Sequence, residues 1–425
     1  MIEIVDKHKC CGCAACVQVC PKQCISFNED EQGFRYPSVD NVVCVNCGLC
    51  ERVCPVLNQD ESKQPLQVYA AKNPNEKIRL MSSSGGIFTM LAESIIDQGG
   101  VVFGARFDEK WEVEHAYTET KDGLEPFRGS KYVQSRIGNT YQQVKEFLLS
   151  GREVLFTGTP CQIAGLKRFL RRDYENLLTV DVVCHGVPSP LVWRTYLKDF
   201  VMCPKGTTEK NTVSISLNEK PVITGISFRD KSTGWKKYGF IVHGKSSEVA
   251  DQNSLSSSSY INQEKILLHE TLDKNLFMQV FLKDLCLRPS CYDCPAKSGK
   301  SGSDLTIADF WGISNTNMLF DDDKGVSLVM VNTNRGSEWF SAFNVESLQM
   351  TYDSALIGNP SIVNSVMENK YINLFWDTFS QSDLCHVREL LELFRPSLMN
   401  RICTKLRSII KRVLPYKFID YISNR

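Results

Sequence analysis

The sequence lacks long apolar runs and an excess of charge of either sign. No run of about eighteen apolar residues occurs in the 425-residue chain, so no conventional membrane-spanning helix is expected. Lysine plus arginine equals aspartate plus glutamate at 49 each, so no overall field favours nucleic acid, and no nucleic-acid partner is expected. The start, residues 1–7, has no basic stretch followed by an apolar one, as a secretory signal would. These absences predict a cytoplasmic protein.

Cysteine, by contrast, is abundant. The chain has 18 cysteines, and ten of them precede residue 55. In a reducing compartment this density indicates metal ligation or catalysis rather than disulfide bonds.

Two copies of one pattern, Cys-x2-Cys-x2-Cys-x3-Cys-Pro, span residues 10–21 and 44–55. Three cysteines at this spacing let one tight loop hold three corners of an iron–sulfur cube, while the fourth reaches the other cube. The pattern therefore predicts a ferredoxin-type module in residues 1–60 with two [4Fe–4S] clusters. The expected ligands are Cys10, Cys13, Cys16 and Cys54 for one cluster, and Cys44, Cys47, Cys50 and Cys20 for the other.

A pair of zinc sites is the alternative for these two runs, because Cys-x2-Cys also suits tetrahedral zinc. Zinc takes four ligands per site, however, and has no use for a third equally spaced cysteine followed by Cys-Pro in duplicate. Cys11 and Cys24 fall outside the pattern, and we expect them to be small buried side chains.

The remaining chain alternates short apolar runs with helical patterns. We expect strands at 68–71, 101–103, 154–156 and 177–183, and helices at about 86–97, 162–170 and 191–199. This alternation predicts a mixed α/β sheet with crossover helices. Residues 212–243, including 213–216, 226–228 and 240–242, have the pattern of antiparallel strands, and the serine-rich stretch 245–260 that of a loop.

The predicted domains span residues 1–60, 66–150 and 151–395, followed by a tail at 396–425. A polar linker is expected at 56–66, between the first two domains. The tail is basic and amphipathic, so it is a candidate for peripheral contact with an anionic membrane or for docking on its own protein.

Three polar turns follow or precede buried elements. Ser82–Gly86 comes before an apolar helix, where hydroxyls and free amides can hold an anion, although simple helix capping explains it alone. Gly129–Ser135 adds a lysine, an aromatic ring and amides. Thr157–Gln162 lies between a strand and a helix, where ligands bind in open α/β sheets.

Four further cysteines form a candidate third cluster site. Cys161 and Cys184 each follow a strand-like run, so both can project toward the pair Cys291-x2-Cys294. A third cluster held by these four is expected, with Cys286 able to replace one of them. A structural zinc ion or unligated thiols are the alternatives.

Together these motifs resemble the beta-subunit family of coenzyme F420 hydrogenase/dehydrogenase, with a ferredoxin domain fused in front. The similarity spans roughly residues 1–395 and rests on six ordered stretches. They are Ser82–Thr89, Gly129–Ser135, Thr157–Gly165, Cys184–Pro188, Arg288–Lys297 and Asp304–Gly312.

The resemblance implies a non-covalently bound FAD beside an added [4Fe–4S] cluster, in a mixed α/β flavin-binding domain. Relatives act on a deazaflavin coenzyme, a chlorophyll-type pigment or substrates not yet defined. The implied FAD contacts are Ser83, Ser84, Gly85, Gly86, Lys131, Gln134, Thr157, Gly158, Thr159 and Gln162.

The expected function is an FAD-dependent iron–sulfur oxidoreductase, in which clusters carry single electrons from an external donor to the flavin for a small-molecule substrate. The donor would be a ferredoxin or a partner reductase. His185 and Lys131 are candidates for proton delivery or flavin tuning, and Asp309 and Trp311 for lining the substrate pocket. The alternatives are an electron-transfer subunit with no substrate of its own, and a cofactor-free scaffold behind an active ferredoxin module.

Overall fold

The computed structural model describes residues 1–202, 222–245, 264–381, 384–392 and 394. The chain forms two compact units, Met1–Asn373 and Leu374–Arg425. The predicted strand at 213–216, all but the first residue of the predicted loop at 245–260, and the predicted tail at 396–425 lie outside the described residues.

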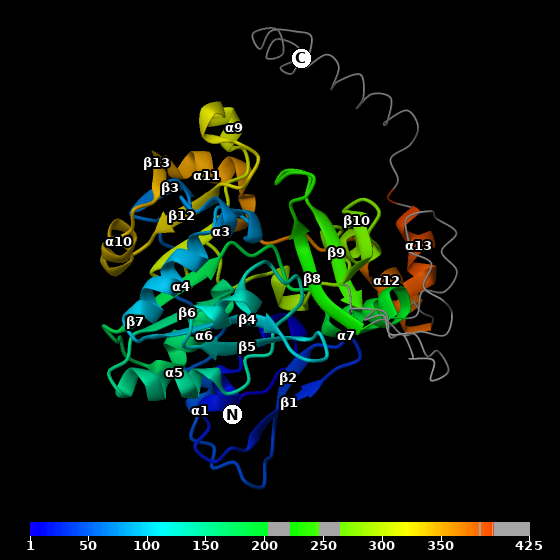
Figure 1. Ribbon diagram of the computed structural model, residues 1–425. Coiled ribbons are helices and arrows are strands. Elements are labelled where there is room, and N and C mark those ends of the chain that lie inside the picture. Colours follow the sequence, from blue (N-terminus) through cyan, green and yellow to red (C-terminus); the bar gives the residue numbers. More distant parts are fainter. Residues whose placement is uncertain (203–221, 246–263, 382–383, 393, 395–425) are drawn as a thin grey trace, which may run out of the picture. The chain divides into compact units, whose positions relative to one another are not determined.

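The N-terminal module contains a short hairpin and two short helices (Figure 1). Strands β1 and β2 pair antiparallel, with Ile25 opposite Val39 and Glu29 opposite Arg35. The two helices, α1 and α2, each begin one residue after a left-handed residue, Ala14 and Gly48. The elements are η1 (Lys7–Lys9), α1 (Ala15–Val19), β1 (Ile25–Glu29), β2 (Arg35–Val39) and α2 (Leu49–Arg52).

An eight-stranded mixed sheet forms the centre of the first unit, in the order β13-β3-β12-β11-β7-β6-β4-β5. Strands β4, β6, β7 and β11 are mutually parallel, and β3 runs in the same direction because both it and β11 are antiparallel to β12. The mixed α/β prediction is therefore confirmed. The strands are β3 (Gln67–Lys72), β4 (Val101–Phe107), β5 (Val113–Thr118), β6 (Val154–Gly158), β7 (Leu177–Val182), β11 (Leu305–Asp309), β12 (Ser327–Val331) and β13 (Glu346–Met350).

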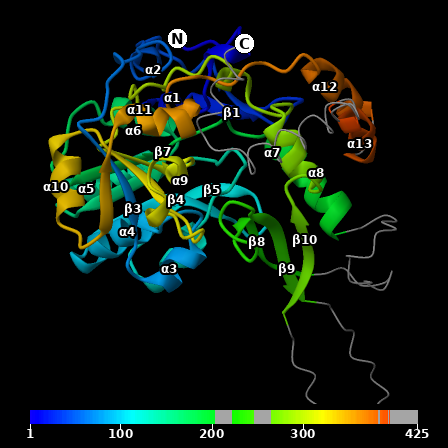
Figure 2. The same cartoon turned by 90° about the horizontal axis from the view of Figure 1, so that it is seen from above.

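Alternate residues of these strands face opposite layers, as the two-residue strand period requires. On one face Phe103 and Phe156 pack with Ile163 of α6 and with Cys13 of the N-terminal module. On the other face Val102 packs with residues of α4. Figure 2 shows α4 and α6 on opposite sides of the sheet. The helices of the layers are α3 (Glu76–Met81), α4 (Ile87–Asp97), η2 (Asp122–Phe127), α5 (Thr140–Leu149), α6 (Pro160–Leu170), α10 (Asn334–Ser341) and α11 (Tyr352–Gly358).

A second, three-stranded antiparallel sheet has the order β10-β9-β8, as residues 226–228 and 240–242 predict. Its inner face is aromatic: Phe228 and Phe240 pack around Trp193, which also contacts Phe277. The elements of this part are β8 (Val222–Asp230), β9 (Gly239–Lys245), β10 (Lys265–Thr271), α7 (Pro190–Tyr196), the π-helical η3 (Leu197–Met202) and α8 (Leu276–Leu282).

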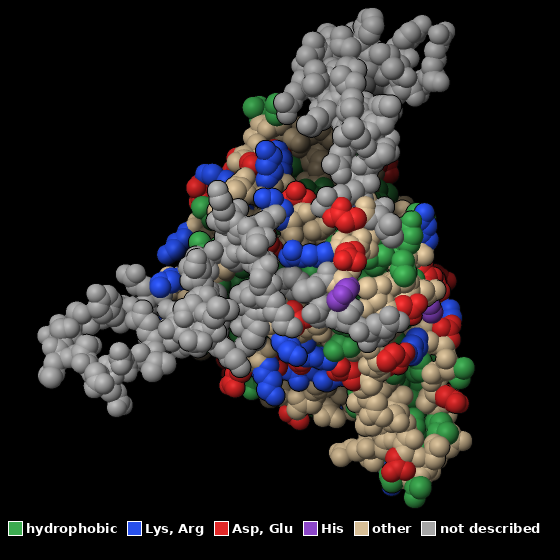
Figure 3. Space-filling view, turned by 90° about the vertical axis from the view of Figure 1, so that its right-hand side faces the viewer, with side chains coloured by type: hydrophobic (Ala, Val, Ile, Leu, Met, Phe, Trp, Pro, Cys, Tyr) green, Lys and Arg blue, Asp and Glu red, His purple; other side chains and the backbone are tan. Residues whose placement is uncertain are grey.

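Short connecting helices complete the first unit: η4 (Pro289–Cys291), α9 (Ile313–Thr316), η5 (Met318–Phe320) and η6 (Pro360–Ile362). Helix α12 (Ile372–Gln381) contains the boundary of the two units, and α13 (Leu384–Glu392) lies in the second unit. Among the described residues no helix is both long and apolar enough to cross a membrane. Lys or Arg and Asp or Glu side chains are interspersed on the described part of the face in Figure 3, in keeping with the zero net charge.

Candidate redox centre

The carboxyl ends of the parallel strands bring the sequence motifs to one edge of the sheet. Thr157 and Gly158 end β6, Cys184 follows β7, and Asp309 ends β11. The Ser82–Gly86 turn joins the same edge, because Ser84 Oγ donates to the carbonyl of Val326 at 2.9 Å. Ligands bind at this edge in open α/β sheets, so the fold itself assembles the candidate site.

The first cysteine set, Cys10, Cys13, Cys16 and Cys54, lies against the central sheet domain. Burial raises the pKa of Cys16, and the nearby thiolates of Cys10 and Cys54 raise it further. Cys13 packs on Gly165 of α6, where an added Cβ would lie 2.8 Å from Cys13 Cβ. Cys54, although remote in the chain, thus lies near Cys10 and Cys16, as the crosswise grouping requires.

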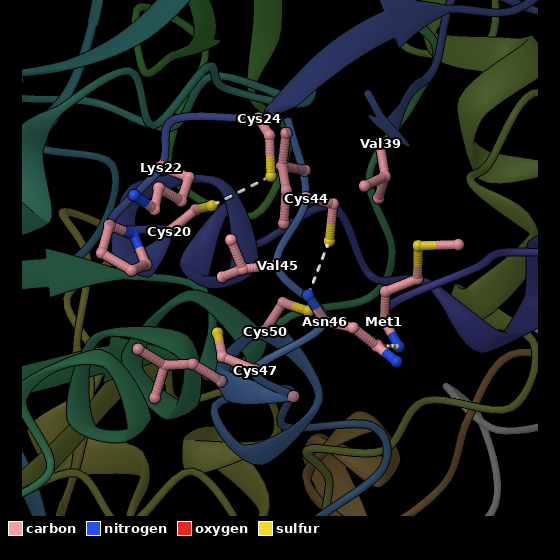
Figure 4. Close-up of a pocket in the computed structure, with 14 residues that line it drawn as sticks. Met1, Cys20, Lys22, Cys24, Val39, Cys44, Val45, Asn46, Cys47 and Cys50 are labelled. Carbon is pink, nitrogen blue, oxygen red and sulfur yellow. Dashed lines mark hydrogen bonds between the residues drawn. The ribbon is translucent and has the colours of Figure 1, made fainter. Parts of the chain in front are cut away.

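The second set, Cys20, Cys44, Cys47 and Cys50, lines one pocket at the outer end of the module (Figure 4). Backbone amides point at two of its sulfurs: Ile2 N donates to Cys50 Sγ at 3.3 Å and Asn46 N to Cys44 Sγ at 3.4 Å. Such N–H···S bonds stabilise thiolates that hold a cluster. Cys24 also lines this pocket, and its Sγ lies 3.4 Å from Cys20 Sγ. Cys24 therefore touches the proposed ligand set, rather than being only a small buried side chain.

The segment after β7 is fastened to the segment around η4, which gathers a third cysteine set. Arg288 N donates to the carbonyl of Val187 at 3.0 Å, and Val187 N donates to Cys291 Sγ at 3.5 Å. Burial raises the pKa of Cys184 to about 12, with contributions from the thiolates of Cys161 and Cys294.

Burial likewise raises the pKa of Cys291, and the thiolate that adds most to this effect is Cys184. Cys161, Cys184, Cys291 and Cys294 therefore lie together. Cys286 is fully buried elsewhere, with Asp284 as the charged group near its thiol. Among the described residues, no three His, Cys, Asp or Glu side chains form a group that could hold a single metal ion.

Two buried cations flank the third set and have no carboxylate partner among the described residues. Arg288 is 1% exposed and Lys297 is 7% exposed. Lys297 Nζ donates to the carbonyls of Cys184 and Ser361, the latter at 2.7 Å. A buried unpaired cation is costly, so these positions favour an anion nearby. Cysteine-ligated clusters carry net negative charge, and the residues present fit them.

The start of α4 has the features of an anion-binding position. Gly86, at φ +82°, precedes the helix, and no side chain caps its first amides. Ser83 Oγ accepts a 2.7 Å hydrogen bond from Ser130 N, which joins the two polar turns. Lys131 Nζ donates to the carbonyls of Arg128 and Gly129, at 2.8 and 3.2 Å.

Burial lowers the pKa of Lys131 to about 7, and no described carboxylate lies within ion-pair distance of it. An uncapped helix start and an unpaired lysine fit the pyrophosphate of a dinucleotide.

A polar network ties the second turn to the third. His115 Nδ1 lies 3.0 Å from Ser135 Oγ and its Nε2 lies 3.0 Å from the Thr157 carbonyl. Gln162 Nε2 donates to Ser135 Oγ at 2.8 Å, while its Oε1 accepts from Thr159 N. Burial lowers the pKa of His115 to about 4, so the imidazole is neutral and serves to position these turns.

Several predicted FAD contacts are engaged within the protein. Gln134 Nε2 donates to the Cys11 carbonyl and its Oε1 accepts from Arg288. Gly85 N donates to Ser327 Oγ, and a Cβ there would lie 2.5 Å from the Ala71 carbonyl. Ser84 and Gln162 are engaged likewise, and Thr157 Oγ1 donates to the Phe103 carbonyl at 3.0 Å.

The two predicted catalytic residues have different surroundings. His185 Nε2 lies 2.6 Å from Asp284 Oδ1, and its ring packs edge-on against Phe281. Lys131 has no such partner among the described carboxylates. Asp309 and Trp311 belong to a closed cluster: Asp309 pairs with Arg229 at 2.6 Å, and Trp311 stacks on Trp235 at 4.8 Å.

A cavity of about 500 Å³ lies between the N-terminal module and the edge strand β5. Gly12 and Ala14 of the first cysteine run form one wall, and Gln134 and Arg136 form another. The cavity therefore reaches the backbone beside Cys13 from the solvent side.

Comparison with known proteins identifies the family. The pattern described as "Coenzyme F420 hydrogenase/dehydrogenase, beta subunit" matches in two parts, its N-terminal part at residues 68–140 and its C-terminal part at residues 151–352. The two regions together cover well over half of the chain. The chain belongs to this beta-subunit family. A "4Fe-4S dicluster domain" matches residues 9–58, which confirms the ferredoxin-type module in front.

One curated relative is the "Coenzyme F420-dependent sulfite reductase" of Methanocaldococcus jannaschii, 26% identical over 200 residues. The alignment covers 46% of this chain and 30% of that protein, so the chain spans about a third of its length. A chain of the F420-reducing [NiFe] hydrogenase complex from Methanosarcina barkeri is similar at 16% identity and a TM-score of 0.43. The similarity covers 74% of this chain and 99% of that one.

Three residues of this family member's site are not indicated by the sequence alone: His115, Arg229 and Arg288. Arg288 lies inside the motif Arg288–Lys297, so a signal exists, but its spacing from the cysteines has no interpretation without the fold. His115 and Arg229 stand outside all six motifs, and only the fold shows what they contact.

Proposed function

We propose that the chain is an iron–sulfur flavoprotein oxidoreductase that receives single electrons and reduces or oxidises a small molecule by two electrons. The observation that carries this proposal is that the third cysteine set and the polar turns meet at one edge of the sheet, with the first cysteine run beside Cys161. FAD, when bound, supplies the exchange between one-electron and two-electron transfer. The membership in an oxidoreductase family supports the same proposal.

The residues of the chain have distinct parts in this proposal. Cys10, Cys13, Cys16 and Cys54, with Cys20, Cys44, Cys47 and Cys50, hold two clusters; Cys161, Cys184, Cys291 and Cys294 hold the third. The amides at the start of α4 and the Lys131 ammonium bind the FAD pyrophosphate. Neutral His115 holds Ser135 and Thr157 in place, and His185 with Asp284 can hold and release a proton near the third cluster.

The composition of the purified protein tests the proposal. Iron, acid-labile sulfide and flavin are measured per chain after anaerobic purification. The expected result is about twelve irons and one FAD. About eight irons without flavin would support only the two clusters of the ferredoxin module and would refute the proposed enzymatic activity.

Two pairs of variants assign the residues. Cys184→Ser removes a proposed ligand and is expected to lower iron by about four per chain, whereas Cys286→Ser, which alters another buried thiol, leaves iron unchanged.

Lys131→Met is expected to weaken FAD retention at least tenfold, since it removes a phosphate partner. Lys121→Met is its control, because Lys121 pairs with Asp97 on the surface. Equal flavin contents in the two lysine variants would contradict the role of Lys131.

A second candidate, an electron-transfer subunit that serves a partner enzyme, is favoured by the share of the curated relative that aligns. Only 30% of that protein is covered, so most of its length lies outside the shared part. The dithionite-reduced isolated chain would then pass its electrons to no small-molecule acceptor and would be reoxidised only when the partner enzyme is added.

A further inference from the structure

Arg288 joins the N-terminal module to the central domain through its whole guanidinium. Its Nε donates to the Cys10 carbonyl at 2.7 Å, and one terminal nitrogen donates to Cys10 Sγ at 3.5 Å and to the Arg35 carbonyl at 3.0 Å. The other terminal nitrogen donates to Gln134 Oε1 at 3.1 Å. The cation also lies over the Tyr36 ring, 4.3 Å from its centre.

The surroundings of Arg288 contain no carboxylate in the part of the chain that the structure describes. Its side chain is 1% exposed, and the ionisable groups near it are the thiols of Cys10, Cys11 and Cys291 and the Tyr36 hydroxyl. Cys10 belongs to the first set and Cys291 to the third. The arginine thus stands between two proposed clusters, and it touches a sulfur of the first.

Within the described residues, no arginine or lysine side chain donates a hydrogen bond to a sulfur of the second set. Cys44 and Cys50 accept hydrogen bonds from backbone amides, which are neutral donors. The reduction potential of a cluster depends on nearby charge, on hydrogen bonds to its sulfurs and on exposure to solvent. A buried cation favours the reduced form, because that form carries one more negative charge.

We propose that Arg288 is a positioning residue that raises the reduction potential of the cluster held by Cys10, Cys13, Cys16 and Cys54 above that of the outer cluster. With that order of potentials, transfer of one electron to a cluster held by the first set from a cluster held by the second would be favourable. The outer cluster would be oxidised and the inner one reduced by that electron, with no change of bond or proton. This inference rests on one part of the proposed function, the presence of the two ferredoxin clusters. It does not require the third cluster or the flavin.

Gln134 keeps the cation in place. It accepts from Arg288 and donates to the Cys11 carbonyl, so it fixes the guanidinium against the first cysteine loop. Gly12 permits the approach: a Cβ there would lie 2.7 Å from Gln134 Nε2 and 3.0 Å from Arg288 Cζ.

The test is a potentiometric titration of the full chain, purified anaerobically, with each reduced cluster followed by electron paramagnetic resonance. Arg288→Gln removes the charge and keeps a hydrogen-bonding side chain. For the cluster of the first set, the expected result is at least a tenfold fall in the ratio of reduced to oxidised form at a fixed applied potential. For a one-electron couple this equals a midpoint potential lower by about 59 mV. The midpoint potentials of the other clusters are expected to shift by less than this.

Arg194→Gln is the matched control. Arg194 also links the module to the central domain, through Glu29 and Glu112, but it contacts carboxylates instead of cysteines. It is expected to leave every potential unchanged. An equal shift in both variants would overturn the inference, since loss of the domain contact would then explain it.

Two further variants decide the matter if Arg288→Gln loses the iron of the first cluster. Arg288→Lys keeps the charge and should give a potential close to that of the natural protein. Gln134→Glu places a carboxylate against the guanidinium and should lower the potential of the same cluster. Unchanged potentials in Gln134→Glu, with full iron content, would overturn the proposal. A chain with about eight irons and no flavin would refute the proposed function yet still permit this test.

Discussion

The loop of Cys10, Cys13 and Cys16 and the loop of Cys44, Cys47 and Cys50 share one spacing and one backbone. The residue before the second cysteine has positive φ in both, +71° at Gly12 and +51° at Asn46. The residue after it does too, +62° at Ala14 and +69° at Gly48. Local sequence thus builds the same cysteine cradle twice.

The surroundings of the two loops differ. Cys13 and Ala15 belong to the main hydrophobic core, together with Tyr141 and Phe169 of the central domain. Cys47 is exposed, and Val42, just ahead of its loop, is 96% exposed. The inner loop is therefore a structural part of the central domain, whereas the outer loop is exposed at the surface of the module. Tertiary contacts, which the shared pattern does not encode, separate the two roles.

The largest effect that separates the loops is expected from removing one thiolate in each. Cys13→Ser should lower both iron content and the thermal midpoint of the whole first unit, because it places a hydroxyl in the core beside Gly165 and Tyr141. Cys47→Ser should remove about four irons and leave the flavin and the unfolding of the central domain nearly unchanged. Calorimetry and iron analysis measure both.

An equal fall of the thermal midpoint in the two serine variants would contradict this difference between the loops. It would mean that the outer loop supports the central domain as much as the inner loop does.

A smaller effect is expected from exchanging the residues before the second cysteine. Asn tolerates positive φ, so Gly12→Asn should keep the backbone and act through its collision with Gln134 and Arg288. Overpacking of this kind typically costs about 1–3 kcal/mol. Asn46→Gly changes a surface position and should stay within about 0.5 kcal/mol. Unfolding midpoints measured anaerobically at one scan rate compare them.

The sequence predicts the local parts of this fold well. The strands at 68–71, 101–103 and 154–156 and the helix at 86–97 lie within β3, β4, β6 and close to α4, because short apolar runs and helical periodicity are local signals. The helix at 191–199 ends as an α-helix at Tyr196, where π-helical residues follow. Strands such as β11 and β12 are not predicted individually, since they depend on partners far away in the chain.

The candidate site shows the same division. Cys161 and Cys184 come after β6 and β7, whose carboxyl ends meet at one edge whatever the side chains are. Cys291 and Cys294 join them through contacts such as that of Arg288 N with the Val187 carbonyl, which local sequence does not indicate. The hydrogen bond between Gln134 and Arg288 cannot be predicted from local sequence, because the two residues are 154 positions apart in the chain. A resemblance assigns residues to a motif, but only the folded chain shows whether their polar groups remain free.

Gly165→Ala tests the contact between the inner loop and α6. Alanine ordinarily stabilises a helix interior by about 0.5–1 kcal/mol relative to glycine. Here the new Cβ would lie 2.8 Å from Cys13 Cβ and 3.0 Å from Cys13 Sγ and Tyr141 Oη. The sign should reverse, to a loss of about 1–2 kcal/mol with an altered spectrum of the first cluster. A gain in the thermal midpoint would show that the loop does not pack there.

The smallest difference is expected at the residues after the second cysteine, Ala14 and Gly48. A left-handed conformation costs an L-residue about 1 kcal/mol, so Gly48→Ala should destabilise by that amount; its Cβ would meet only Arg52, at 3.4 Å, and Glu51, at 3.7 Å. Ala14→Gly relieves the same strain but loses about 0.8 kcal/mol from a buried methyl group, so its net change should be close to zero. The two thermal midpoints measure this difference. Equal and opposite shifts would mean that the Ala14 methyl contributes nothing, and the inner loop would then be no better packed than the outer one.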